Sequence, residues 1–222
     1  MKMRIKNLMA VAFMLLTFTG VDAFAKKEKT PDWQNPNVYE INRLPMRSTF
    51  TTDGNKLDLN GIWDFKWNKD MNSRPMDFYS LSYSSETWDK IPVPGLWEIN
   101  GFGDPVYLNY GYAWETYYKH NPPYAPVERN WLGQYRRTFT LDESWKGEDV
   151  FLHIGSATSN VRVWINGKEV GYSEDSKLEA RFNVTDYVKT GENLIALEIF
   201  RWCDGTYLED QDFWRMTGIA RD

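Results

Sequence analysis

The fold of this chain is constrained above all by a series of short segments in which buried and exposed positions are expected to alternate, as in β-strands. Turn residues separate these segments. At residues 61–67 the aromatic side chains of Trp63, Phe65 and Trp67 alternate with other side chains, which predicts a half-buried strand with an aromatic face. The pair Asn166-Gly167 predicts a hairpin, because both residues accept positive φ. Further strands are predicted at residues 133–141, 149–156, 160–166, 169–173, 181–184 and 193–201.

Many short strands without a long helical period indicate an all-β protein. The 222 residues, with 42% hydrophobic and 16% aromatic content, are sufficient for one domain with a substantial core. We therefore predict an antiparallel jelly-roll or galactose-binding-like β-sandwich.

Two segments do not follow the strand pattern. Residues 26–48 are polar, contain prolines and have no period, so we expect an extended arm on a neighbouring surface, without secondary structure of its own. Residues 92–131 are rich in aromatic residues and prolines, which predicts a long ordered loop region, and such loops are commonly functional. The sandwich domain is expected to span residues 49–222.

The first 25 residues have the three parts of a secretory signal peptide. Basic residues 1–7 precede an apolar stretch at 8–21 and a small-residue site at 23–25, so cleavage is predicted after Ala25. Since fourteen apolar residues are too few to span a membrane, we expect a periplasmic or secreted protein without a membrane anchor.

The charge and cysteine content exclude several classes of protein. Cleavage after Ala25 would remove three basic residues and one acidic residue and change the net charge from −5 to −7, which disfavours nucleic acid and anionic membranes as partners. Cys203 is the only cysteine, so an internal disulfide is impossible. No histidine and cysteine cluster has zinc spacing, and no glycine-rich turn predicts a phosphate site.

The most informative candidate for chemistry is the stretch 201–222, RWCDGTYLEDQDFWRMTGIARD, with five carboxylates, three arginines and four aromatic residues. Carboxylates and guanidinium groups bind sugar hydroxyls, and aromatic rings pack on the apolar faces of a pyranose. A solvated acidic loop beside a strand is the simpler alternative for the same composition.

The amino-acid sequence of this stretch closely resembles the end of the first domain of the large bacterial β-galactosidases of glycoside hydrolase family 2. The resemblance extends over nearly all of residues 26–222, through the arm motifs DWQNP (32–36) and NRL (42–44), the loop motif NPP (121–123) and the segment VGYSEDS (170–176). The order and spacing of these motifs make the resemblance specific.

This resemblance implies an activity for a longer parent enzyme. Such enzymes hydrolyse terminal β-D-galactosides with retention, by means of two glutamates on a (β/α)₈ barrel downstream of the matching segment. No catalytic residue is therefore assigned in this chain, although Asp204, Glu209 and Asp210 lie close together in sequence. The 222 residues alone are expected to be inactive.

Asn109 and Asp212 acquire roles from the resemblance: both would bind galactose hydroxyls, and Asp212 would also ligate a sodium ion. An ionised carboxylate suits both tasks, while an Asn amide donates and accepts hydrogen bonds. The alternatives are a turn residue for Asn109 and a salt bridge to Arg215 for Asp212.

A second cation site, for magnesium, is implied in the arm and the sandwich. Its ligands would be Asp32, Asn35 and the Val38 carbonyl from the arm, with Glu174 and Asp204 from the sandwich. Glu174 departs from the best-known relatives, which carry a Gln, and so adds negative charge to the site.

Two functions of other classes stay open. A free-standing carbohydrate-binding module would use an aromatic platform among Trp97, Tyr107, Tyr110, Tyr112 and Trp114, whereas a complementing fragment would use residues 26–48. β-Glucuronidases and β-mannosidases are the nearest rivals within the enzyme interpretation, although YLEDQDFWR, NPPY and DWQNP favour galactosidases. The natural galactoside stays undetermined, and the parent enzyme is expected to be a homo-oligomer.

Overall fold

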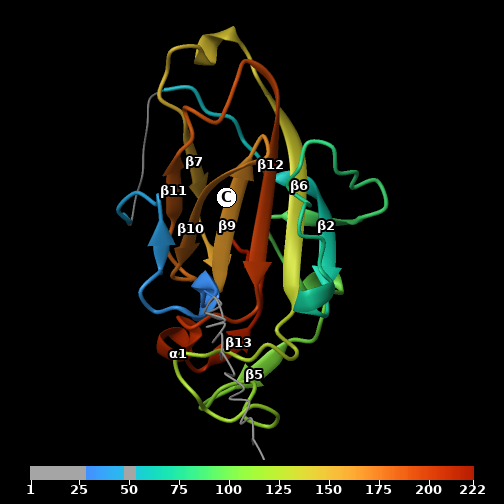
Figure 1. The fold of residues 1–222 in the computed structure, drawn as a ribbon, viewed down its shortest axis with the longest axis vertical. Helices are drawn as coiled ribbons and strands as arrows, with labels where there is room; N and C mark the ends of the chain where they lie inside the picture. Colours follow the sequence, from blue (N-terminus) through green and yellow to red (C-terminus); the bar gives the residue numbers. More distant parts are fainter. Residues whose placement is uncertain (1–28, 48–53) are drawn as a thin grey trace, which may run out of the picture.

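The computed structural model describes residues 29–47 and 54–222, and the predicted signal peptide lies outside the described residues. These residues form an antiparallel β-sandwich (Figure 1), which confirms the predicted all-β fold class. In order across the large sheet, the strands are β1 (Glu40–Ile41), β10 (Lys168–Glu174), β9 (Asn160–Ile165), β12 (Gly191–Phe200), β6 (Leu132–Leu141), β2 (Gly61–Asn68) and β3 (Asp89–Val93).

Three smaller sheets complete the fold. They are the pair β11 (Ala180–Asn183) with β7 (Phe151–Ile154), the trio β4 (Gly95–Leu96), β14 (Gly218–Ile219) and β8 (Ala157–Thr158), and the ribbon of β5 (Val106–Leu108) with β13 (Phe213–Arg215). The helices are one-turn elements: η1 (Asp32–Gln34), η2 (Met71–Ser73), η3 (Glu98–Asn100), η4 (Glu143–Trp145) and α1 (Thr206–Glu209). None of the helices in the described part of the chain has the length and apolarity to cross a membrane.

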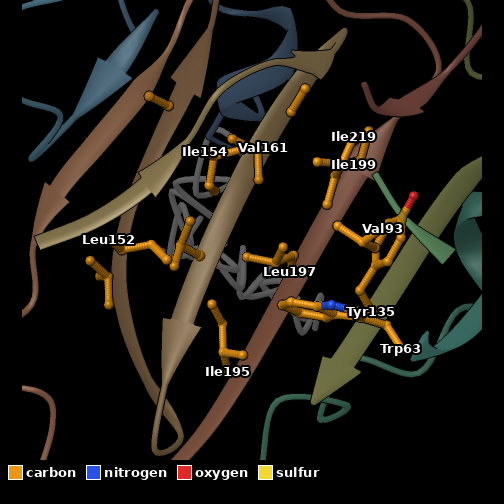
Figure 2. Close-up of a cluster of buried hydrophobic side chains, with 14 of the residues drawn as sticks. Trp63, Val93, Tyr135, Leu152, Ile154, Val161, Ile195, Leu197, Ile199 and Ile219 are labelled. Atoms are coloured by element: carbon orange, nitrogen blue, oxygen red, sulfur yellow. The ribbon is translucent and has the colours of Figure 1, made fainter. Parts of the chain in front are cut away.

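The core is formed by the apolar faces of the strands. Figure 2 shows Trp63 and Tyr135 packed near Leu197 and Ile199, with Leu152 and Ile154 contributed by β7. Within β2, Trp63 and Phe65 are buried two residues apart, as the alternation predicts, and Trp67 is partly buried.

Each of the seven predicted strands corresponds to an observed strand. These strands are β2, β6, β7, β9, β10, β11 and β12. The hairpin at Asn166-Gly167 is also confirmed, since Lys168 pairs with Ile165 and both turn residues have positive φ. The prediction that residues 92–131 contain no strand is wrong, because β4 and β5 lie within this segment.

The arm differs from its prediction, because it contributes a strand to the sandwich. Residues 40–41 form β1, which pairs with the edge of β10, and Arg43 forms a bridge with Phe182 of β11. The arm therefore closes the edge of the sandwich between two sheets. Gly171 permits this contact, because a Cβ atom there would lie 2.2 Å from the carbonyl oxygen of Ile41.

Candidate functional site

The ribbon β5–β13 brings Asn109 and Asp212 together. Leu108 pairs with Phe213 in an antiparallel register, so the next residue pair along the ribbon is Asn109 and Asp212. Both side chains are exposed. The ribbon lies with α1 at one end of the sandwich, at the bottom of Figure 1.

Two aromatic residues extend this face of the ribbon. Tyr107 lies directly opposite Trp214, and their ring centroids are 5.5 Å apart. The Tyr107 hydroxyl donates a hydrogen bond of 2.7 Å to Oδ1 of Asp212. Since side chains two residues apart in a strand share a face, Tyr107, Asn109, Asp212 and Trp214 are expected on one face of the ribbon. We call this set of four residues the ribbon face.

Hydrogen bonds from buried residues fix the ribbon to the sandwich. The Glu98 carboxylate accepts from the backbone N–H of Thr217 at 2.8 Å and from its hydroxyl at 3.1 Å. Burial raises the pKa of Glu98, while the bonds from Thr217 lower it. The chain that leaves β13 is therefore held against η3.

Arg215 contributes the second attachment. Its guanidinium donates to the carbonyl oxygens of Leu108 and Phe213 and forms an ion pair with Asp210. The salt bridge of Arg215 is thus made with Asp210, whereas Asp212 receives its hydrogen bond from Tyr107. The alternative interpretation of Asp212 as the partner of Arg215 is therefore wrong.

The aromatic platform predicted for a binding module is wrong in part. Trp97 and Trp114 are 0% exposed, and Tyr112 is stacked on Trp114 at 5.1 Å in a second hydrophobic cluster. Tyr110 is 82% exposed and Trp214 is 54% exposed, so both can contact a ligand. The sequence analysis does not name Trp214 as a ligand contact, because its exposure depends on a ribbon that only the tertiary structure reveals.

A small cavity of about 50 Å³ lies beside the ribbon and is lined by Arg201, Asp210 and Phe213 among others. Asn109 and Asp212 do not line it. The ribbon face is therefore an open surface of this chain, separate from that cavity.

The second predicted site is a pair of buried carboxylates. Glu174, at the end of β10, and Asp204 have oxygen atoms within 4.8 Å of one another and of the Cys203 thiol. Burial and the nearby charge of Asp204 raise the pKa of Glu174 to about 8, although a 2.6 Å hydrogen bond from Tyr172 lowers it. Burial also raises the pKa of Cys203, so its thiol is protonated at neutral pH.

The arm lies across this carboxylate pair. The backbone N–H of Asp204 donates to the carbonyl of Trp33, and that of Glu174 donates to the carbonyl of Tyr39, each at 2.9 Å. Asn35 and Val38 lie in the turn between them, where the Val38 N–H donates to the Asn35 carbonyl.

Asp32 has a different partner. Its Oδ2 accepts a 2.6 Å salt bridge from Arg162, whose guanidinium also packs over the ring of Tyr172 at 4.7 Å. Asp32 is not part of the cluster formed by Glu174, Cys203 and Asp204.

The carboxylate pair fits a hard cation. Oδ1 of Asp204 is buried without a hydrogen-bond partner among the described residues, and two adjacent carboxylates raise each other's affinity for positive charge. Glu174 and Asp204 are the residues that would hold such an ion. Asp32 would contribute only after rearrangement of its pair with Arg162.

Replacing Arg162 with Met is expected to weaken docking of the arm by about 1–2 kcal/mol, because Asp32 would lose a charged hydrogen bond. Limited trypsin digestion with mass spectrometry should then show about tenfold faster cleavage after Arg43, in the arm. Arg129→Met, at an exposed position, is the control. Equal cleavage rates in both variants would contradict a role for Arg162 in holding the arm.

Comparisons with known proteins agree with this architecture. The sequence profile described as "Glycosyl hydrolases family 2, sugar binding domain" matches residues 57–222. The β-galactosidase of Priestia megaterium is 41% identical and the match covers 86% of this chain and 20% of that protein. The β-galactosidase of Halalkalibacterium halodurans is 36% identical, with 89% of this chain and 21% of that protein covered.

Solved structures show the same fold. A β-glucuronidase of Bacteroides uniformis has a TM-score of 0.54 at 22% identity over 74% of this chain and 16% of that one. A β-glycosidase of Bacteroides vulgatus has a TM-score of 0.53 at 23% identity over 76% of this chain and 19% of that one. At this identity the likeness concerns the fold alone.

The antiparallel sandwich, together with the matching family model, defines the class, a sugar-binding domain of glycosyl hydrolases. The chain belongs to glycoside hydrolase family 2, and residues 57–222 are its sugar-binding domain. It spans about a fifth of the length of the curated relatives it matches.

Proposed function

We propose that this chain supplies part of the galactose subsite of an exported β-galactosidase that hydrolyses terminal β-D-galactosides with retention. The observation that carries the proposal is the ribbon register, which places Asn109 beside Asp212 on an exposed face. These two residues would bind sugar hydroxyls, and Trp214 or Tyr110 would pack on an apolar sugar face. The catalytic carboxylates would lie in another part of a longer protein.

The proposal includes two cations bound by this chain. Asp212 would ligate sodium next to the sugar, because its Oδ2 is left for a ligand while Oδ1 accepts from Tyr107. Magnesium would bind Glu174 and Asp204 beneath the arm, where it would neutralise two buried carboxylates. Export rests on the signal-peptide pattern of residues 1–25.

The test is a comparison of substrates with the full-length gene product. 4-Nitrophenyl β-D-galactoside, β-D-glucuronide and β-D-mannoside should be assayed side by side, and the galactoside is expected to be hydrolysed with the highest kcat/KM. Asn109→Ala and Asp212→Asn are expected to raise KM for the galactoside about tenfold or more, because the first removes hydrogen bonds to the sugar and the second removes the charge that strengthens them and holds the cation. Asp149→Asn, another exposed aspartate, is the matched control.

Preference for the glucuronide or the mannoside would contradict the proposed substrate. An unchanged KM in both site variants would contradict the role of the ribbon face. No hydrolysis of any of the three glycosides, with galactose binding retained by the protein, would favour a carbohydrate-binding module instead.

A further inference from the structure

We propose that Tyr107 is a positioning residue, which holds the Asp212 carboxylate in the orientation that binds the sugar. The inference rests on the proposed function of Asp212. Its basis is the 2.7 Å hydrogen bond from the Tyr107 hydroxyl to Oδ1 of Asp212, across the two strands of the ribbon. Tyr107 acts through Asp212, and no contact of its own with substrate is required.

Asp212 needs such a partner because of its place in the chain. It is an exposed residue that immediately precedes β13, and the backbone bends there. Among the described residues, the Tyr107 hydroxyl is the donor that reaches its carboxylate. An exposed side chain without this bond would sample several rotamers, and the binding of a ligand would have to overcome that freedom.

Tyr107 is itself well placed to restrain Asp212. Its backbone is paired with Trp214 in the ribbon, and its ring packs against the Trp214 ring at a centroid distance of 5.5 Å. The ribbon is in turn held by the bonds of Arg215 to Leu108 and Phe213. The Tyr107 hydroxyl is therefore carried by a ring whose position is restrained by Trp214 and by the ribbon.

The hydrogen bond engages only part of the carboxylate. With Oδ1 bound to Tyr107, Oδ2 remains for a sugar hydroxyl or a cation, since each oxygen of a carboxylate accepts separately.

The experiment is a double-mutant cycle in the full-length gene product. Tyr107→Phe, Asp212→Ala and the double variant are assayed with 4-nitrophenyl β-D-galactoside. Tyr107→Phe retains the ring, so folding should be unaffected, and urea denaturation checks this. Tyr39→Phe is the matched control, because Tyr39 is also exposed, at 57%, but lies in the arm.

We expect Tyr107→Phe to raise KM about fivefold and to change kcat less, the magnitude of one hydrogen bond to a charged group at an exposed position. In the Asp212→Ala background, where no side-chain oxygen is left to accept the hydrogen bond, the same change should have almost no further effect, because Tyr107 acts through the carboxylate. A general structural role would produce additive effects.

Three results separate the inference from the proposed function. If Asp212→Ala raises KM and Tyr107→Phe does not, the inference is overturned and the proposed function stands. If the two substitutions raise KM additively, Tyr107 does not act through Asp212 and the inference is again overturned. If neither Asn109→Ala nor Asp212→Asn changes KM, the proposed function fails and the inference fails with it.

Discussion

Replacing Glu174 with Gln is expected to increase the free energy of unfolding at pH 8.5 by about 3–5 kcal/mol in the absence of divalent cations. Burial raises the pKa of Glu174 from 4.5 to about 8 in the folded chain, and the charge of Asp204 acts in the same direction. A glutamine side chain is uncharged, so its burial avoids the cost of removing water from a charged carboxylate. It also keeps an oxygen that can accept the hydrogen bond from Tyr172.

The expected pH dependence follows from the sign of this shift. A carboxyl group with a raised folded-state pKa contributes its full stability below the unfolded pKa, near 4.5, and loses it as the pH rises through about 8. The two proteins should therefore have similar stability at pH 4.5, and their difference should grow until about pH 8.

Urea denaturation at pH 4.5, 6.5 and 8.5 with a chelator would measure this difference, with Glu192→Gln as an exposed control. Added magnesium should narrow the gap, because a cation between Glu174 and Asp204 stabilises the ionised forms. A difference that does not change with pH, or a variant less stable than the native chain at pH 8.5, would contradict the prediction.

Replacing Trp97 with Ala is expected to lower the free energy of unfolding by about 3–5 kcal/mol, the usual cost of deleting a large aromatic side chain from a core. Trp97 is 0% exposed and packs against Phe65 at 5.9 Å, and its indole N–H donates to the hydroxyl of Tyr135. A Cβ atom on Gly133 would lie 2.5 Å from the Trp97 ring, so the space around the ring is already filled.

The matched control is Trp214→Ala, which removes the same side chain from a position that is 54% exposed. Its cost is expected to stay below about 1 kcal/mol. Urea denaturation of both variants provides the comparison. Equal losses of stability would show that burial of Trp97 does not decide its contribution.

Five strands of the large sheet, β2, β6, β9, β10 and β12, follow from local sequence, whereas β1 and β3 were not predicted. Alternation at residues 61–67 predicts β2 because side chains point to opposite faces of a strand, and Asn166-Gly167 predicts a hairpin because its backbone angles are a property of those two residues. The carboxylates and aromatic residues of 201–222 are compatible with sugar binding, but their composition fits a solvated acidic loop as well, and only the family resemblance separates the two.

The ribbon face could not be predicted from local sequence in the same way. β5 and β13 have three residues each, too few to show a period, and they pair across about a hundred residues of chain. Asn109 and Asp212 were named through family resemblance, whereas their adjacency, and the bond from Tyr107, depend on that long-range register. The same applies to Glu174 and Asp204, which meet because β10 and β12 lie on either side of β9 in the large sheet.

Because alternation and turn chemistry act over a few residues, local sequence was enough to predict the all-β class, the principal strands and the hairpin. Tertiary structure alone decided which aromatic residues are buried, because Trp97 and Trp214 have the same side chain and differ only in what packs around them. It also decided which polar residues face one another, since strand pairing joins segments that no local pattern connects.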